Sequence, residues 1–234
     1  PTMPSLARYD QIVDGTRNVL EFARKTGVRR FLLTSSGGVY GPQPEGIQGI
    51  PEDWTGMPDS LDTGQTYSVA KRTAEHLTAL YHQAFGLETV VARCFAFVGP
   101  DLPFDAHFAI GNFIRDALGH EAIRVKGDGA PIRSYMDQED LARWLWELLA
   151  RGVPNRAYNV GSDQAMSLKA LALRVRDLLA PQKPVVVEGR GEAEGARNVY
   201  VPSIERARHE LGLDLRFGLD EAILRAARPH LLAQ

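Results

Sequence analysis

The chain has 234 residues, of which 44% are hydrophobic and 24% are charged, a composition typical of a globular protein with one large or two small domains. Its formal net charge of −2 gives no indication of a nucleic-acid partner. There is no apolar run of about 18 residues and no signal-peptide pattern, so we expect no membrane association. Cys94 is the single cysteine, which excludes an intrachain disulfide and fits a cytoplasmic protein. The six histidines lack zinc spacing, so we expect no metal.

The first half of the chain alternates predicted helices and strands. Residues 8–26 have apolar side chains at helical spacing, and Gly27 follows them as a stop signal. The segment "RRFLLTSS" predicts a short buried strand that ends in hydroxyls, before a glycine-rich turn. Residues 42–64 predict a long loop, and residues 66–85 a second helix. The apolar run "ETVVARCFAF" suits a parallel strand buried on both faces. This alternation predicts an α/β fold with a doubly wound parallel sheet.

The second half predicts a smaller α+β part, with a boundary near residues 98–106. We expect helices in "HFAIGNFIRDALG", in "DQEDLARWLWELLARG" with Asp137 as N-cap, and in "SLKALALRVRDLLAP" with Ser167 as cap. Short strands are expected in "AIRVKGDG", "AYNVG" and "PVVVE", and two short helices between residues 203 and 232.

Tyr67 and Lys71 are the residues that most clearly suggest chemistry. Residues four apart share one face of a helix, so the ammonium of Lys71 should lower the pKa of the Tyr67 phenol from its usual value near 10. Such a phenol can take a proton from a substrate hydroxyl. Ser36, at the end of the preceding strand, could hold the same oxygen, because ligands of α/β sheets bind at the carboxyl ends of the strands. The alternative is a half-buried ring beside a solvated amine.

Five segments in order carry a family resemblance: "FLLTSSGGVYG", "YSVAK", "VVARCFAFVGP", "VKGDGAPIRSYMDQEDLA" and "YNVGSD". Together they resemble the extended short-chain dehydrogenase/reductase family, and within it the NAD-dependent epimerase/dehydratases that act on nucleotide sugars. The resemblance covers the chain from about residue 8 onward and implies a Rossmann-like sheet. Residues 1–100 would then be the C-terminal portion of the cofactor domain. Residues 101–234 would mainly bind substrate, with some segments returning to the sheet.

The resemblance also implies roles for individual residues. Tyr67 would be the acid/base, Lys71 would hold the nicotinamide ribose, and Ser36 would bind the sugar hydroxyl. Arg133 would grip the nucleotide diphosphate, although a surface ion pair is the alternative. The implied catalytic set is Ser36, Tyr67 and Lys71; the implied cofactor contacts are Thr34, Ser35, Tyr67, Lys71, Cys94 and Phe95; the implied substrate contacts are Ser36, His107, Phe108, Arg133 and Arg190.

The chain departs from the family pattern at its cofactor-binding end. No GxxGxxG turn is present, and the nearest match, Gly189-x-Gly191 followed by Gly195, has the wrong spacing. By comparison with the family, roughly 70 to 90 residues of the nucleotide-binding half are missing, which predicts a bare edge on the "FLLTS" strand. Either the chain is a fragment, or it is a natural truncated product paired with another chain. If it is only this chain, dinucleotide binding should be weak or absent.

Two smaller departures bear on the reaction. Gly37 and Gly38 occupy the positions at which the 4,6-dehydratases carry an acid and a carboxylate, which argues against dehydration. Ala96 replaces an asparagine that commonly contacts the substrate. We therefore expect an epimerase-like oxidoreductase that uses NAD, with NADP as the alternative cofactor, and a nucleotide-diphosphate sugar as substrate. A 4-keto reductase, a 4,6-dehydratase and a non-catalytic fragment or partner subunit are the alternatives. The resemblance also implies a homodimer through helices 8–26 and 66–85.

Overall fold

The computed structural model describes residues 3–105, 108–189 and 199–232. The chain forms two compact units, and each of them combines segments that are distant in the sequence. The first unit consists of Pro1–Phe95, Arg143–Val160 and Pro202–Asp214, and the second consists of Ala96–Ala142, Gly161–Val201 and Leu215–Gln234.

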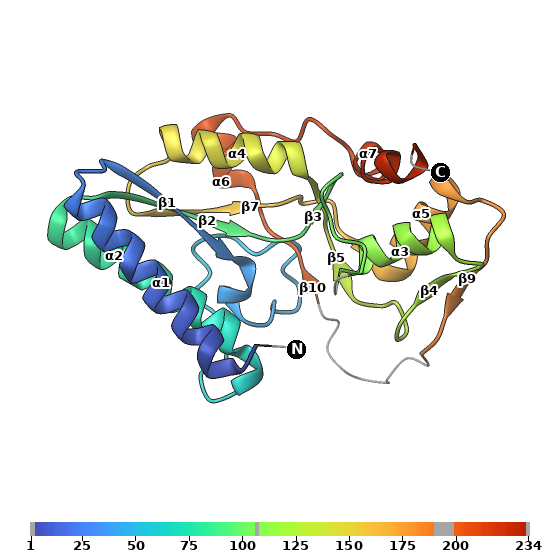
Figure 1. Ribbon diagram of the computed structural model, residues 1–234, viewed down its shortest axis with the longest axis horizontal. Helices are drawn as coiled ribbons and strands as arrows, with labels where there is room; N and C mark the ends of the chain where they lie inside the picture. The colour runs from blue at the N-terminus through green and yellow to red at the C-terminus, as the bar shows by residue number, and fades with distance from the viewer. Residues whose placement is uncertain (1–2, 106–107, 190–198, 233–234) are drawn as a thin grey trace. The chain divides into compact units, whose positions relative to one another are not determined.

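A parallel sheet forms the centre of the first unit. Its strands lie in the order β1-β2-β7, and the register places Ser36 beside Cys94 at the carboxyl ends of β1 and β2. Within the described residues β1 is an edge strand, because β2 is its only neighbour. In Figure 1, α1 and α2 cover one face of this sheet, and α4 and α6 lie over the other. The elements of this unit are α1 (Ser5–Lys25), β1 (Arg30–Ser36), the 3-10 helices η1 (Gly37–Tyr40) and η2 (Thr63–Gln65), α2 (Thr66–Phe85), β2 (Glu88–Cys94), β7 (Arg156–Val160), α6 (Glu205–Leu211) and most of α4 (Gln138–Arg151).

Helix α2 forms where the sequence predicts it, because both its apolar face and its end signal are local. Ala70, Ala74 and Leu77 recur at helical spacing and are buried, and they pack against α1 and the sheet. Gly86 ends the helix in the left-handed conformation, with φ of 70°, and its N–H donates to the carbonyl of His82 at 2.9 Å. The helix therefore begins at a fixed point beside the end of β1, which is the place where a site can form.

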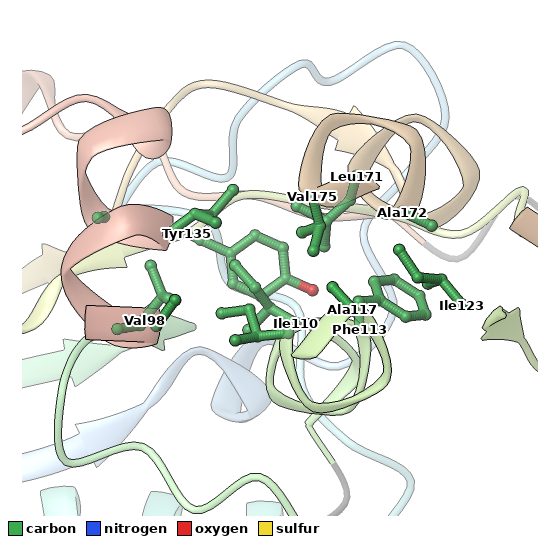
Figure 2. Packing of buried hydrophobic residues seen from close by; sticks show 14 of the residues in the cluster. Val98, Ile110, Phe113, Ala117, Ile123, Tyr135, Leu171, Ala172 and Val175 are labelled. Atoms are coloured by element: carbon green, nitrogen blue, oxygen red, sulfur yellow. The ribbon is translucent and has the colours of Figure 1, made fainter. Parts of the chain in front are cut away.

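The second unit is built around three helices that pack on short strands. Its core joins α3, α5 and α7, and Figure 2 shows the ring of Tyr135 enclosed among Ile110, Phe113, Ala117 and Val175. The Ser167 side chain caps α5 by accepting a hydrogen bond from Ala170 N, as predicted. The elements of this unit are β3 (Phe97–Val98), α3 (Ala109–Gly119), β4 (Ile123–Val125), β5 (Ile132–Arg133), β6 (Met136–Asp137), β8 (Met166–Ser167), α5 (Leu168–Leu179), β9 (Val185–Val187), β10 (Val199–Tyr200) and α7 (Leu219–Leu231).

The predicted α/β class and Rossmann-like sheet are confirmed, with a parallel sheet covered by helices in the first unit. Among the described residues, no helix combines the length and the apolar character needed to cross a bilayer.

Candidate active site

The end of β1 and the start of α2 bring the three predicted catalytic side chains together. Ser36 is the last residue of β1, and its hydroxyl is near enough to the phenol of Tyr67, in the first turn of α2, to lower the pKa of that phenol. Lys71 follows Tyr67 by four residues, and its Nζ lies 5.9 Å from the centre of the Tyr67 ring. The site therefore combines a strand end and a helix start, with two hydroxyls near each other and an amine beside them.

The orientation of Ser36 is fixed by the turn after it. Its Oγ accepts a hydrogen bond of 3.1 Å from Gly38 N and so caps η1. The side chain is nearly buried, which leaves few alternative rotamers. A hydroxyl that accepts from the backbone can still donate its own hydrogen, so Ser36 is able to orient a substrate oxygen next to Tyr67.

The expected effect of Lys71 on the phenol is not found, and this prediction was wrong for the ligand-free chain. The pKa of Tyr67 is raised: burial raises it most, the hydrogen bond with Ser36 opposes this, and the thiol of Cys94 adds to the rise. The ammonium of Lys71 makes its hydrogen bond to the carbonyl of Thr34, at 2.9 Å, and burial lowers the pKa of Lys71 itself. Burial therefore has a larger effect on the pKa of Tyr67 than the charge of Lys71, whose ammonium is hydrogen-bonded to the carbonyl of Thr34.

The residues predicted to contact the cofactor surround this pair. The main chain of Thr34 holds Lys71, and the side chain of Thr34 is exposed. The hydroxyl of Ser35 donates a hydrogen bond to Glu75. The contact predicted between Ser35 and the cofactor stays a prediction, and it would use the main chain of Ser35. Burial raises the pKa of Cys94 to about 11, which makes it a poor nucleophile at neutral pH. The Phe95 ring packs over Gly37.

An open cavity of about 820 Å³ runs along the free edge of β1 beside α1, and both Tyr67 and Lys71 line it. Thr34 and apolar residues of β1 complete this wall. An ammonium and a phenol that face one cavity offer hydrogen bonds to the hydroxyls of a ribose. The phenol of Tyr67 and the ammonium of Lys71 therefore fit a ribose of a nicotinamide dinucleotide.

The two glycines after Ser36 have no room for side chains. A Cβ on Gly37 would lie 2.6 Å from Cζ of Phe95, and a Cβ on Gly38 would lie 2.5 Å from Oγ of Ser68. The packing around the turn thus agrees with the absence of an acid and carboxylate pair at these positions.

The predicted substrate contacts belong to the second unit. Arg133 lies on β5, where its Nη1 donates to the carbonyl of Ile132 and its guanidinium stands over the Tyr200 ring at 5.8 Å. Burial lowers the pKa of Arg133. Phe108 is exposed just before α3. His107 and Arg190 lie outside the described residues.

Sequence reasoning did not find a cation-rich cavity in the second unit. This cavity of about 510 Å³ lies between α3, β4 and the start of α5, and its lining includes Asn112, His120, Arg124 and Lys126. Arg124 pairs with Glu188 at 3.1 Å, whereas Lys126 has no ion-pair partner among the described residues. The alternation of exposed Arg124 and Lys126 with buried neighbours along β4 was the available signal. Within the described residues, no cluster of three or more histidine, cysteine, aspartate or glutamate side chains could hold a metal ion.

Comparison with known proteins gives consistent matches over this chain. UDP-glucuronic acid decarboxylase 4 of Arabidopsis thaliana is 32% identical over 211 residues, which are 90% of this chain and 46% of the relative. UDP-glucose 4-epimerase of Thermotoga maritima, solved with UDP-glucose, has the same fold with a TM-score of 0.85 at 22% identity, over 97% of this chain and 71% of the other. RMD of Pseudomonas aeruginosa, solved with NADPH, has a TM-score of 0.81 at 25% identity, over 94% and 73%.

The chain spans about half the length of two of the curated decarboxylases that it matches, 46% of each. The profile of the NAD dependent epimerase/dehydratase family matches residues 5–161, which include β1, α2, β2 and β7 together with Ser36, Tyr67 and Lys71. The chain therefore belongs to the NAD dependent epimerase/dehydratase family.

Proposed function

We propose that this chain carries the catalytic and substrate-binding part of an epimerase-like oxidoreductase that acts on nucleotide-diphosphate sugars with NAD as cofactor. The observation that carries the proposal is the placement of Ser36 beside Tyr67 at the carboxyl end of β1, with Lys71 one turn away. NADP is the alternative cofactor, and the relative solved with NADPH supports its inclusion.

Ser36, Tyr67 and Lys71 have different roles in the proposed reaction. Ser36 holds a sugar hydroxyl against Tyr67, and Tyr67 takes its proton as the adjacent carbon loses a hydride. Bound NAD would take up that hydride and return it to the keto carbon. Lys71, one turn along, is placed to hold the cofactor ribose from the cavity wall. Because burial raises the pKa of Tyr67, the phenol must lose its proton before it can act as the base in this oxidation. Formation of the phenolate is then the step that pH controls.

The nucleotide part of the substrate is assigned to the second unit. Arg133 is the proposed diphosphate contact, since a guanidinium fork matches phosphate oxygens. The cavity lined by Arg124 and Lys126 adds positive charge in the same unit. Phe108 remains a proposed substrate contact on the strength of the resemblance alone.

The related dehydratase and decarboxylase reactions begin with the same oxidation and differ in their later steps. A 4-keto reductase would use only the return of hydride. A 4,6-dehydratase is disfavoured, because Gly37 and Gly38 leave no space for the acid and carboxylate pair. Decarboxylation of a UDP-glucuronic acid is the second candidate, and two relatives that are 32% identical, UDP-glucuronic acid decarboxylases 4 and 2 of Arabidopsis thaliana, favour it. Oxidation at C4 would make the C6 carboxylate part of a β-keto acid, which can lose CO2 without a further acid.

We also assign the exposed apolar side chains of α1 and α2 to a homodimer interface. Leu6 and Phe22 on α1, and Leu80 and Phe85 on α2, are large, apolar and exposed on two adjacent helices. Two such helices from each copy could form a four-helix contact, which the family resemblance also implies.

The test uses the purified chain with NAD and three substrates in parallel: UDP-glucose, UDP-galactose and UDP-glucuronic acid. Products are followed by proton NMR, and cofactor uptake is followed by NADH fluorescence. The proposal expects inversion at C4, and Tyr67→Phe should abolish it without lowering the melting temperature. Conversion of UDP-glucuronic acid to a pentose would select the decarboxylase. If the chain bound no cofactor and changed none of the three sugars, the non-catalytic alternative would replace the proposal.

A further inference from the structure

A single carboxylate ties α2 to the strand ends directly behind the proposed catalytic pair. Glu75 Oε1 accepts hydrogen bonds from Ser35 Oγ at 2.6 Å and from Arg93 Nε at 3.1 Å, and its Oε2 accepts from Arg93 Nη2 at 2.8 Å. Ser35 and Arg93 are neighbours in the register of β1 and β2. The side chains of Glu75 and Arg93 are each only 12% exposed, so this is a nearly buried and bidentate ion pair.

Arg93 also contacts Glu52 and Tyr40, and through Tyr40 the network reaches β7. Its Nη1 donates to the carbonyl of Glu52 at 3.2 Å, and its guanidinium lies 4.7 Å from the centre of the Tyr40 ring. Tyr40 is fully buried and donates to Asn159 Oδ1 on β7 at 2.7 Å. Burial alone would lower the pKa of Arg93, but the hydrogen bond and the charge of Glu75 outweigh it and raise that pKa. The network therefore links α2, β1, β2 and β7.

Glu75 also stands in a definite relation to the catalytic residues. It follows Lys71 by four residues and Tyr67 by eight, so all three are on one face of α2. Ser35 and Ser36 are adjacent at the end of β1, and Ser35 Oγ contacts Glu75 Oε1 at 2.6 Å. A contact that fixes Ser35 thereby fixes the main chain that carries Ser36.

A buried ion pair is weak evidence for stability, because well-packed apolar residues often replace one without loss. What a bidentate pair does supply is a fixed distance and angle between two elements. Here the two elements are α2, which carries Tyr67, and β2, whose Arg93 is paired in register with Ser35 of β1, next to Ser36.

We propose that Glu75 and Arg93 are positioning residues, which keep the Ser36 hydroxyl within hydrogen-bonding distance of Tyr67 by anchoring Ser35. Neither residue is assigned a contact with the reacting atoms: Glu75 acts through Ser35, and Arg93 acts through Glu75. The effect on catalysis rests on the proposed function, whereas the effect on the Tyr67 phenol does not. Loss of the anchor should reduce kcat about tenfold, as loss of a supporting contact commonly does, and should leave KM for the nucleotide sugar unchanged.

The experiment follows the titration of Tyr67 by NMR of protein labelled with 13C at tyrosine Cζ, and the Tyr67→Phe variant assigns its signal. Glu75→Gln keeps the size of the side chain and removes its charge, and Ser35→Ala removes only the link to β1. Glu21→Gln is the matched control, since Glu21, like Glu75, accepts a hydrogen bond from a side-chain hydroxyl, that of Tyr81 at 2.5 Å, and pairs with an arginine, Arg24, at 3.0 Å. Lys71 on α2 and Cys94 on β2 are the titratable groups beside the phenol, and they are the same in all these variants.

Glu75→Gln and Ser35→Ala should raise the midpoint of Tyr67 by about half a pH unit or more, because the hydrogen bond from Ser36 no longer stabilises the phenolate. Glu21→Gln should leave that midpoint at the parent value. If both test variants fold and Tyr67 titrates as in the parent, the positioning role is overturned, even if the parent turns over substrate. If Glu75→Gln does not fold, Ser35→Ala decides: a shift supports the role and an unchanged midpoint ends it. A shift in a chain without turnover would leave the positioning role intact and reject only the proposed function.

Discussion

The ammonium of Lys71 donates a 2.9 Å hydrogen bond to the carbonyl oxygen of Thr34, so its principal contact is with the edge strand and not with the phenol of Tyr67. This contact joins α2 to β1 next to the cavity along the free edge of the strand. In the ligand-free chain, Lys71 thus helps to place the helix, while the burial of Tyr67 determines the direction of the phenol pKa.

The first prediction separates these two effects. Lys71→Met should leave the titration midpoint of Tyr67 in the ligand-free chain almost unchanged, because burial, Ser36 and Cys94 account for the shift. The same variant should weaken NADH binding, since the ammonium of Lys71 is removed from the cavity wall. Tyrosine-labelled NMR measures the first outcome and fluorescence titration the second. A clear rise of the Tyr67 pKa in Lys71→Met would show that the ammonium does lower it.

The second prediction concerns the turn after Ser36. Gly38→Ala should destabilise the chain by about 1–3 kcal/mol, because its Cβ would lie 2.5 Å from Ser68 Oγ. Removing that oxygen should relieve the strain, since the Cβ of Ser68 would remain at 3.5 Å. The double variant with Ser68→Ala should therefore be more stable than the sum of the two single changes implies.

Urea unfolding of the four proteins in this cycle measures the coupling. Gly15→Ala on α1 is the control, because nothing lies within 4 Å of its added Cβ, and it should gain about 1 kcal/mol from helix propensity. Additive effects of Gly38→Ala and Ser68→Ala would contradict the steric explanation.

Several elements could be predicted closely because their signals are local. The predicted bounds of α2 match the structure, since an apolar stripe and Gly86 both lie within the segment. Ser167 was predictable as a cap because a hydroxyl before an apolar run needs only nearby N–H groups. The strands β5, β6, β8 and β10 were not predicted as separate strands, because two residues are too few to show a period.

The sequence allowed the residues of the candidate site to be predicted, but not the direction of the pKa shift of Tyr67. Ser36 and Tyr67 meet because a strand end and a helix start are brought together by a parallel sheet, which the pattern indicated. The rise in the Tyr67 pKa depends on burial and on the partner of Lys71, and neither can be read from spacing. The link from Ser35 to Glu75 joins residues 40 apart in the chain, so only the folded structure reveals it.

The third prediction concerns stability at alkaline pH. Burial raises the pKa of Tyr135 from its ordinary value of 10 to about 12, and Figure 2 shows its hydroxyl within the apolar cluster of the second unit. A raised folded-state pKa gives stability that is complete below pH 10 and is lost as the pH rises through 12. The loss is about 1.4 kcal/mol per pH unit, or about 3 kcal/mol in total. Tyr135→Phe should flatten the decline of the unfolding free energy between pH 10 and 12, and an unchanged slope in urea melts would contradict this.

The last prediction tests the dimer through α1 and α2. Phe22 is 64% exposed on α1, beside α2, and an aspartate there would place a charge in the proposed interface. Phe22→Asp should convert a dimer into a monomer in sedimentation, and its far-UV circular dichroism should stay unchanged because the side chain is outside the core. Trp146→Asp on α4 is the matched control, since Trp146 is 72% exposed on a helix over the other face of the sheet. Dissociation by Trp146→Asp and not by Phe22→Asp would move the interface from α1 and α2 to α4.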